Sequence, residues 1–148
     1  MSQPPFVPPG GSYLGVVGRK HPAEAYAQAW DLLEASAPRK ALSILEPAIE
    51  DEPEAMSLIT LRAWAYFQSA QLAKAEADLL VLVESNPTDL WARFALGRVL
   101  ERQARYAEAL THMRLAAVMS GDPEHQTGVL RCERKLSAET GKPLPDLD

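Results

Sequence analysis

The chain has 148 residues, 47% of them hydrophobic, which is enough for one ordinary globular domain with a buried core. Its 15 Lys and Arg against 20 Asp and Glu give a formal net charge of −5, which argues against binding to nucleic acid or anionic lipid. The single cysteine, Cys132, excludes an internal disulfide, and no apolar run reaches the roughly 18 residues that a membrane span needs. We therefore expect no membrane insertion and a cytoplasmic location.

The first segment of the chain, residues 1–20, is rich in proline and glycine. Such a composition cannot bury enough apolar surface to fold, so a disordered N-terminal tail is predicted. The tail nevertheless carries a few apolar side chains, among them Phe6, Tyr13 and Leu14. One hypothesis is that it folds back onto a binding surface and competes with a partner, and the alternative is a plain solvated tail.

The chain after the tail repeats itself with a period of 34 residues, a signature of stacked helical repeats. The period joins Pro53 to Pro87, and it also joins Ala41, Ala75 and Ala109. Three other columns keep the size of the side chain, namely Ala29, Ala63 and Gly97; Leu32, Tyr66 and Leu100; and Leu45, Leu79 and Met113. A further column, Ala48, Leu82 and Ala116, keeps an apolar residue. The three copies cover about residues 22–55, 56–89 and 90–123.

Within each copy, apolar residues three and four apart predict two amphipathic helices joined by a tight turn. The expected helices are 22–35 and 38–51, then 54–69 and 72–85, then 88–103 and 106–119. The columns of small residues predict a close crossing of the two helices of a pair. Gly121 is expected to end the sixth helix in a left-handed conformation, and Pro47 is expected to kink the second.

A last helix is predicted at about residues 124–140. Its apolar stripe, Val129, Leu130, Cys132 and Leu136, suits a helix that closes the end of a repeat stack. Gly141 and Pro143 end it, and residues 141–148 are expected to form a C-terminal tail.

The 34-residue period, the run Leu96-Gly97 followed by Leu100, Tyr106, Ala109 and Ala116, and the Asn86-Pro87 junction together resemble tetratricopeptide repeats (TPRs). The resemblance covers residues 22–123, which are 102 residues (3 × 34). It implies an all-α domain over residues 21–140, a right-handed superhelical stack of three helix pairs plus a C-terminal capping helix. The chain departs from the family pattern at Gln28 and Arg62, where a large apolar residue is usual.

The resemblance also implies a non-catalytic protein–protein interaction module, an adaptor that binds an apolar peptide or helix in the concave groove lined by the first helices. The groove residues carried over are Tyr26, Trp30, Thr60, Trp64, Phe67, Trp91, Phe94, Arg98 and Arg102. Exposed aromatic rows usually mark binding surfaces, and the two arginines would pair with a carboxylate of the ligand. The alternative interpretation is that the rings only pack between repeats or beneath the tail. A scaffold that self-associates through the same surface, for instance as a homo-dimer, is the second functional hypothesis.

Catalytic and metal chemistry find little support in the sequence. The three histidines, His21, His112 and His125, are scattered, and Cys132 lies in an apolar stripe. No metal-ligand spacing and no phosphate-binding glycine loop is present. We therefore expect no enzyme activity, no catalytic or metal residue and no cofactor, with a protein or peptide as the partner.

Overall fold

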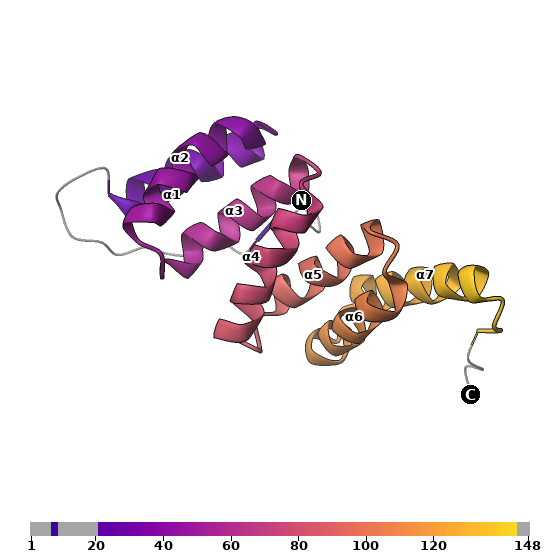
Figure 1. Cartoon of the computed structure of the whole chain (residues 1–148). Coiled ribbons are helices and arrows are strands. Elements are labelled where there is room, and N and C mark those ends of the chain that lie inside the picture. Colours follow the sequence, from indigo (N-terminus) through magenta and orange to yellow (C-terminus); the bar gives the residue numbers. More distant parts are fainter. Residues whose placement is uncertain (1–6, 9–20, 145–148) are drawn as a thin grey trace. The chain divides into compact units, whose positions relative to one another are not determined.

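The computed structural model describes residues 7–8 and 21–144, and every regular element in them is a helix (Figure 1). The helices are α1 (Pro22–Glu34), α2 (Pro38–Asp51), α3 (Met56–Gln68), α4 (Leu72–Ser85), α5 (Leu90–Arg102), α6 (Tyr106–Ser120) and α7 (Pro123–Thr140). Each helix predicted from the sequence is present, with both ends within two residues of the expected position. The all-α class and the closing seventh helix are thus confirmed for the described part of the chain.

The chain divides into two compact units, residues 1–86 and residues 87–148, which are called unit 1 and unit 2 below. In unit 1, α1 packs against α2 and α3, and α3 also packs against α2 and α4. In unit 2, α6 packs against both α5 and α7. The predicted tails lie outside the described residues except for 7–8 and 141–144, and the side chain of Pro8 is fully buried.

The helix ends follow from the residues that stand there. The Asp89 side chain accepts a hydrogen bond from the amide of Ala92 at 3.0 Å, and Asp122 caps α7 in the same way. Proline occupies the first position of α1, α2 and α7, where its missing N–H costs nothing. Gly121 adopts φ +66° at the end of α6, as predicted. Helix α2 is continuous through Pro47, so the kink expected there remains a prediction.

The turn inside each helix pair repeats the same backbone conformation. Ser36, Ala70 and Ala104, each 34 residues from the next, have φ of 56°, 58° and 59°. In each turn the following amide donates a hydrogen bond to the carbonyl five residues back, as in Arg105 to Leu100 at 3.0 Å. The left-handed conformation is unfavourable for a residue with a Cβ atom, so the tight turn is made at some cost in free energy.

The columns of small residues lie at the helix crossings, as the sequence indicates. Ala29, Ala41 and Ala75 are completely buried. At Gly97 of α5, a Cβ atom would come within 2.5 Å of the Met113 Cγ atom and 3.3 Å of the Ala109 carbonyl oxygen of α6. The 34-residue period therefore reflects close packing of each first helix on its partner.

Candidate protein-binding surface

An aromatic cluster joins α1 to α3 in unit 1. Tyr26 and Trp30, one turn apart on α1, stack with ring centroids 6.1 Å apart, and Trp30 meets Trp64 of α3 edge-on at 5.4 Å. Trp64 is only 4% exposed, whereas Tyr26 and Trp30 are half-buried. The indole of Trp64 is thus the base of the cluster, and the α1 rings present part of their surface to solvent. We call Tyr26, Trp30, Trp64 and Phe67 the aromatic surface of unit 1.

Polar contacts fix the helices that carry this surface. Gln68, one residue after Phe67, donates from Nε2 to the Leu33 carbonyl at the end of α1 at 3.0 Å. Arg62 forms a two-pronged ion pair with the buried Asp78 of α4, at 2.7 and 2.8 Å. Arg62, which stands where the TPR pattern usually has a large apolar residue, therefore has a charged partner on the next helix. The hydrogen bonds from Arg62 to Asp78 raise the pKa of the Arg62 guanidinium.

The predicted groove residues of unit 1 come together, but not all of them are exposed. Thr60 and Phe67 are half-buried on α3, and the Thr60 hydroxyl donates to the Met56 carbonyl of its own helix at 2.9 Å. Because Thr60, Trp64 and Phe67 stand four and three residues apart, they share one face of α3. Trp64, however, is buried and does not present a free ring.

In unit 2 the predicted groove residues have other partners. Phe94 is 7% exposed, its ring lies 4.4 Å from that of His125, and it contacts Gly128 of α7. The Phe94 ring therefore packs between α5 and α7 and does not line an open groove. For this residue the structure agrees with the alternative interpretation, in which the rings only pack inside the fold. Trp91 is half-buried and Arg102 is exposed.

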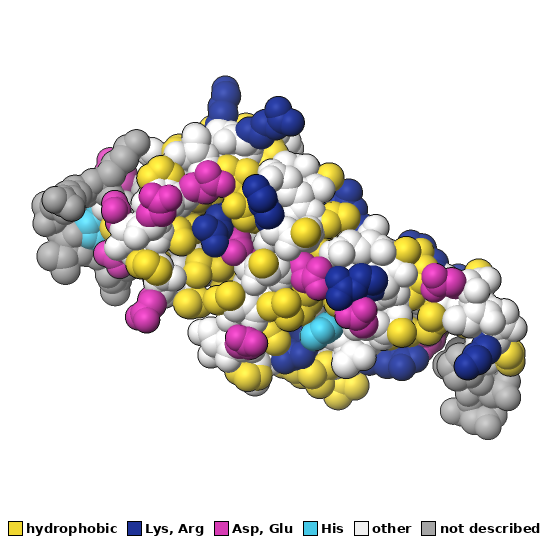
Figure 2. All heavy atoms as spheres, viewed as in Figure 1, with side chains coloured by type: hydrophobic (Ala, Val, Ile, Leu, Met, Phe, Trp, Pro, Cys, Tyr) yellow, Lys and Arg dark blue, Asp and Glu magenta, His cyan; other side chains and the backbone are white. Residues whose placement is uncertain are grey.

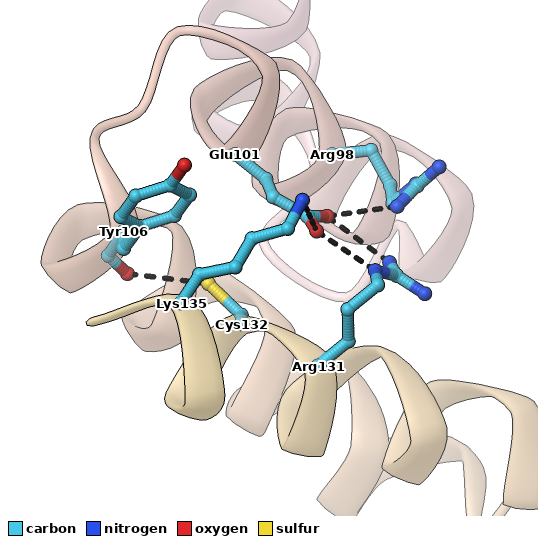
Figure 3. A network of polar contacts seen from close by, with 6 residues as sticks. All are labelled: Arg98, Glu101, Tyr106, Arg131, Cys132 and Lys135. Carbon is cyan, nitrogen blue, oxygen red and sulfur yellow. Dashed lines mark hydrogen bonds and ion pairs between the residues drawn. The ribbon is translucent and has the colours of Figure 1, made fainter. Parts of the chain in front are cut away.

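The Arg98 guanidinium, predicted to bind a ligand carboxylate, instead pairs with Glu101 of its own helix at 2.8 Å. Glu101 is 3% exposed and also accepts hydrogen bonds from two residues of α7, Arg131 at 2.8 and 3.0 Å and Lys135 at 3.0 Å (Figure 3). Burial would raise the pKa of Glu101, but the hydrogen bonds from Arg131 and Lys135 and the charge of Arg98 lower it to about 2. This cation cluster, Arg98, Arg131 and Lys135 around Glu101, was not predicted from the sequence. The sequence shows Glu101 among arginines of α5, which is a signal for an ion pair within that helix. Its α7 partners, Arg131 and Lys135, lie 30 and 34 residues further along the chain and could not be assigned to it from the sequence.

Two features bear on reactive chemistry within the described residues: the environment of the single cysteine and the grouping of metal-ligating side chains. The Cys132 thiol is buried and donates to the Tyr106 carbonyl at 3.5 Å, and burial raises its pKa to about 11. A thiol in this state is a poor nucleophile. No group of three or more His, Cys, Asp or Glu side chains in residues 7–8 and 21–144 could hold a metal ion. Nor is any helix within these ranges long and apolar enough to cross a membrane.

The surface charge differs between the units. Residues 1–86 contain 6 Lys and Arg and 11 Asp and Glu, whereas residues 87–148 contain 9 of each, so the net charge of −5 lies in unit 1. Figure 2 shows acidic side chains gathered over α1 and α2. The acidic run from Glu50 to Glu54 at the end of α2 is exposed.

Known structures match this arrangement of helices closely. The chain superimposes on MamA of AMB-1 with a TM-score of 0.71 and 19% identity, over 81% of this chain and 66% of MamA. The first TPR domain of human RPAP3 matches with a TM-score of 0.75 and 17% identity, over 85% of this chain and 100% of that domain. The fold is of the tetratricopeptide type. The TPR domain of Sgt2 from Aspergillus fumigatus matches at 0.73 and 22%, over 86% of this chain and 88% of that one.

No family model matches the sequence, and a comparison with curated proteins gives no significant match. The identities to the TPR structures, 17 to 22%, are those of a shared fold. The TPR fold is therefore established at the level of structure, and the partner has to be argued from the surface of this chain.

Proposed function

We propose that this protein is a protein–protein interaction module whose TPR helices bind an apolar peptide or amphipathic helix of a partner. The observation that carries the proposal is the aromatic surface of unit 1. Tyr26 and Trp30 stack at 6.1 Å and remain half-exposed above the buried Trp64. Rigid, partly exposed aromatic rings supply a large contact area at a low entropic cost, which is why they are frequent at the centres of interfaces.

The packing beneath the surface supports the same proposal. Trp64 holds the Trp30 ring edge-on, and the Gln68 side chain ties α3 to the end of α1. A surface held in this way is organised before the partner arrives, so less conformational entropy is lost on binding. The apolar face of a partner helix, with residues three and four apart, matches the spacing of Tyr26 and Trp30 along α1.

The test is affinity capture with wild-type and Trp30→Ala baits, followed by a binding measurement with the purified partner. Leu80→Ala is the matched control, because Leu80 is an exposed apolar residue (43%) on α4 of the same unit. We expect Trp30→Ala to weaken partner binding at least about tenfold while Leu80→Ala leaves it unchanged. Equal affinity of both variants for the partner would contradict the proposal.

Thermal unfolding of each bait, followed by circular dichroism, tests whether a variant that loses binding is still folded. Sedimentation of the chain alone tests the second functional hypothesis, in which the chain self-associates through the same surface. If the aromatic surface joined two copies instead, the free chain would run as a dimer and Trp30→Ala would make it a monomer.

A further inference from the structure

We propose that the cation cluster of unit 2 is a docking site for an acidic segment of a protein partner, whose Asp or Glu side chains bind the outer N–H groups of Arg131 and Lys135. This inference rests on the proposed function, since it specifies the chemistry of the partner that the module binds. It assigns a role to three residues, Arg98, Arg131 and Lys135, that the aromatic surface does not involve.

The α7 cations that bind Glu101 carry more charge than its carboxylate can neutralise. Arg131 and Lys135 both pair with this single carboxylate, so one of their two positive charges is left over. One cation would neutralise the buried carboxylate, and the second is therefore not accounted for by the burial of Glu101. Glu133, which lies on α7 between Arg131 and Lys135, pairs instead with Arg114 of α6 at 2.8 Å.

The negative and positive charges of the cluster lie at different depths. The Glu101 side chain is 1% exposed, whereas the side chains of Arg131 and Lys135 are 39% and 47% exposed. The carboxylate thus lies beneath the cations, and the excess positive charge faces solvent. Figure 3 shows the side chains of Arg98, Arg131 and Lys135 converging on Glu101 from two helices.

Arg131 and Lys135 have more hydrogen-bond donors than Glu101 uses. Arg131 uses Nε and Nη2 to bind Glu101, which leaves Nη1 without a hydrogen bond to any described residue. A guanidinium has five N–H groups and an ammonium has three, and Lys135 donates only one of its three to Glu101. Several charge-assisted donors therefore remain for a second layer of carboxylates.

Glu101 acts as a positioning residue in this arrangement. By binding both α5 and α7 side chains, it fixes long and flexible cations in one geometry before a ligand arrives, and this lowers the entropic cost of binding. Unit 2 as a whole has no net charge, with 9 Lys and Arg against 9 Asp and Glu. A local cluster on a neutral unit suits a short acidic peptide better than the long, uniform charge of a nucleic acid.

The experiment uses the full chain and a pair of fluorescent peptide probes. One is a short amphipathic peptide with Leu on one face and several Glu on the other, and in the second every Glu is replaced by Gln. We expect the Glu peptide to bind roughly tenfold more tightly than the Gln peptide at low salt, with the difference shrinking as NaCl is added. Arg131→Gln and Lys135→Gln should each weaken binding of the Glu peptide by about fivefold.

Arg134→Gln is the matched control, because Arg134 is an exposed cation on the same helix with no contact to Glu101. It should change the affinity by less than about twofold. Arg131 contributes two hydrogen bonds to Glu101 and Lys135 only one, so Lys135→Gln gives the binding readout with the smaller effect on folding. Melting curves of all variants are recorded alongside.

Equal binding of the two peptides, no loss in Arg131→Gln and Lys135→Gln, or an equal loss in Arg134→Gln would overturn the acidic-segment proposal. Displacement of the Glu peptide by single-stranded DNA, or self-association of the free chain that Arg131→Gln abolishes, would assign the cluster to another occupant and overturn it too. The Gln peptide tests the proposed function separately. If Trp30→Ala abolishes binding of the Gln peptide, the aromatic surface is supported as a binding site whatever the result for the cation cluster. If both peptides still bind to Trp30→Ala, the aromatic surface is not the binding site.

Discussion

Truncation of the two indoles in unit 1 should have very different effects on stability. Trp64 is 4% exposed, so Trp64→Ala removes a large buried side chain and should cost about 3–5 kcal/mol of unfolding free energy. Trp30 keeps part of its surface in water, and Trp30→Ala should cost roughly 1–2 kcal/mol. For a chain of this size, about 3 °C of melting temperature corresponds to each kcal/mol, so Trp64→Ala should melt roughly 9–15 °C lower.

The assay is urea unfolding of the wild type, Trp64→Ala, Trp30→Ala and the double variant, followed by far-ultraviolet circular dichroism. The edge-on contact at 5.4 Å should appear as a coupling of about 0.5–1.5 kcal/mol between the two substitutions. Leu80→Ala, which removes an exposed side chain, should stay within about 0.5 kcal/mol of the wild type. If Trp64→Ala were no more destabilising than Trp30→Ala, Trp64 would not be the buried base of the aromatic surface.

Three further substitutions test the packing and the electrostatics. Ala104→Gly relieves a left-handed alanine at φ 59° and should stabilise the chain by about 0.5–1 kcal/mol in urea unfolding, and a loss of stability would contradict the strain assigned to this turn. Gly97→Ala places a Cβ atom 2.5 Å from the Met113 Cγ atom. This clash should outweigh the gain of about 1 kcal/mol in helix propensity, so the melting temperature of the variant should fall. A higher melting temperature would show that the Met113 side chain moves aside without loss of packing. Because the pKa of Glu101 is lowered from 4.5 to about 2, its stabilising contribution, on the order of 3 kcal/mol, should be present above about pH 5 and be lost as the pH falls towards 2. Glu101→Gln should remove that part of the acid dependence when unfolding is measured across this range, and an unchanged acid dependence would refute the assignment.

The helices could be predicted from the sequence because the relevant information is local or periodic. Ala41, Ala75 and Ala109 are completely buried at equivalent positions of successive pairs, so one spacing predicts three buried residues. Gly121 could be predicted as a left-handed cap because glycine is the residue that pays least for positive φ. Ser36, Ala70 and Ala104 adopt the same conformation without glycine, and their residue types gave no sign of it.

The exposure of the candidate site could not be predicted in the same way. Trp30 and Trp64 are one period apart and equivalent in sequence, yet one is half-exposed and the other is buried, because exposure depends on which neighbouring helix covers the ring. Phe94 is covered by α7, a helix whose packing on α5 is not encoded in the 34-residue period. The contacts of Glu101 with Arg131 and Lys135 are long-range for the same reason.

If a partner lies on the half-exposed rings of α1, a reactive group placed there should bond to it. We would replace Tyr26 with a photo-crosslinking phenylalanine analogue and, separately, replace Leu80 on α4 with the same analogue as the control. After irradiation with the purified partner, mass spectrometry reads the covalent adducts. We predict an adduct from position 26, formed with an apolar residue of the partner and suppressed by Trp30→Ala, and none from position 80. An adduct from position 80 with none from position 26 would show that the partner does not bind the rings of α1.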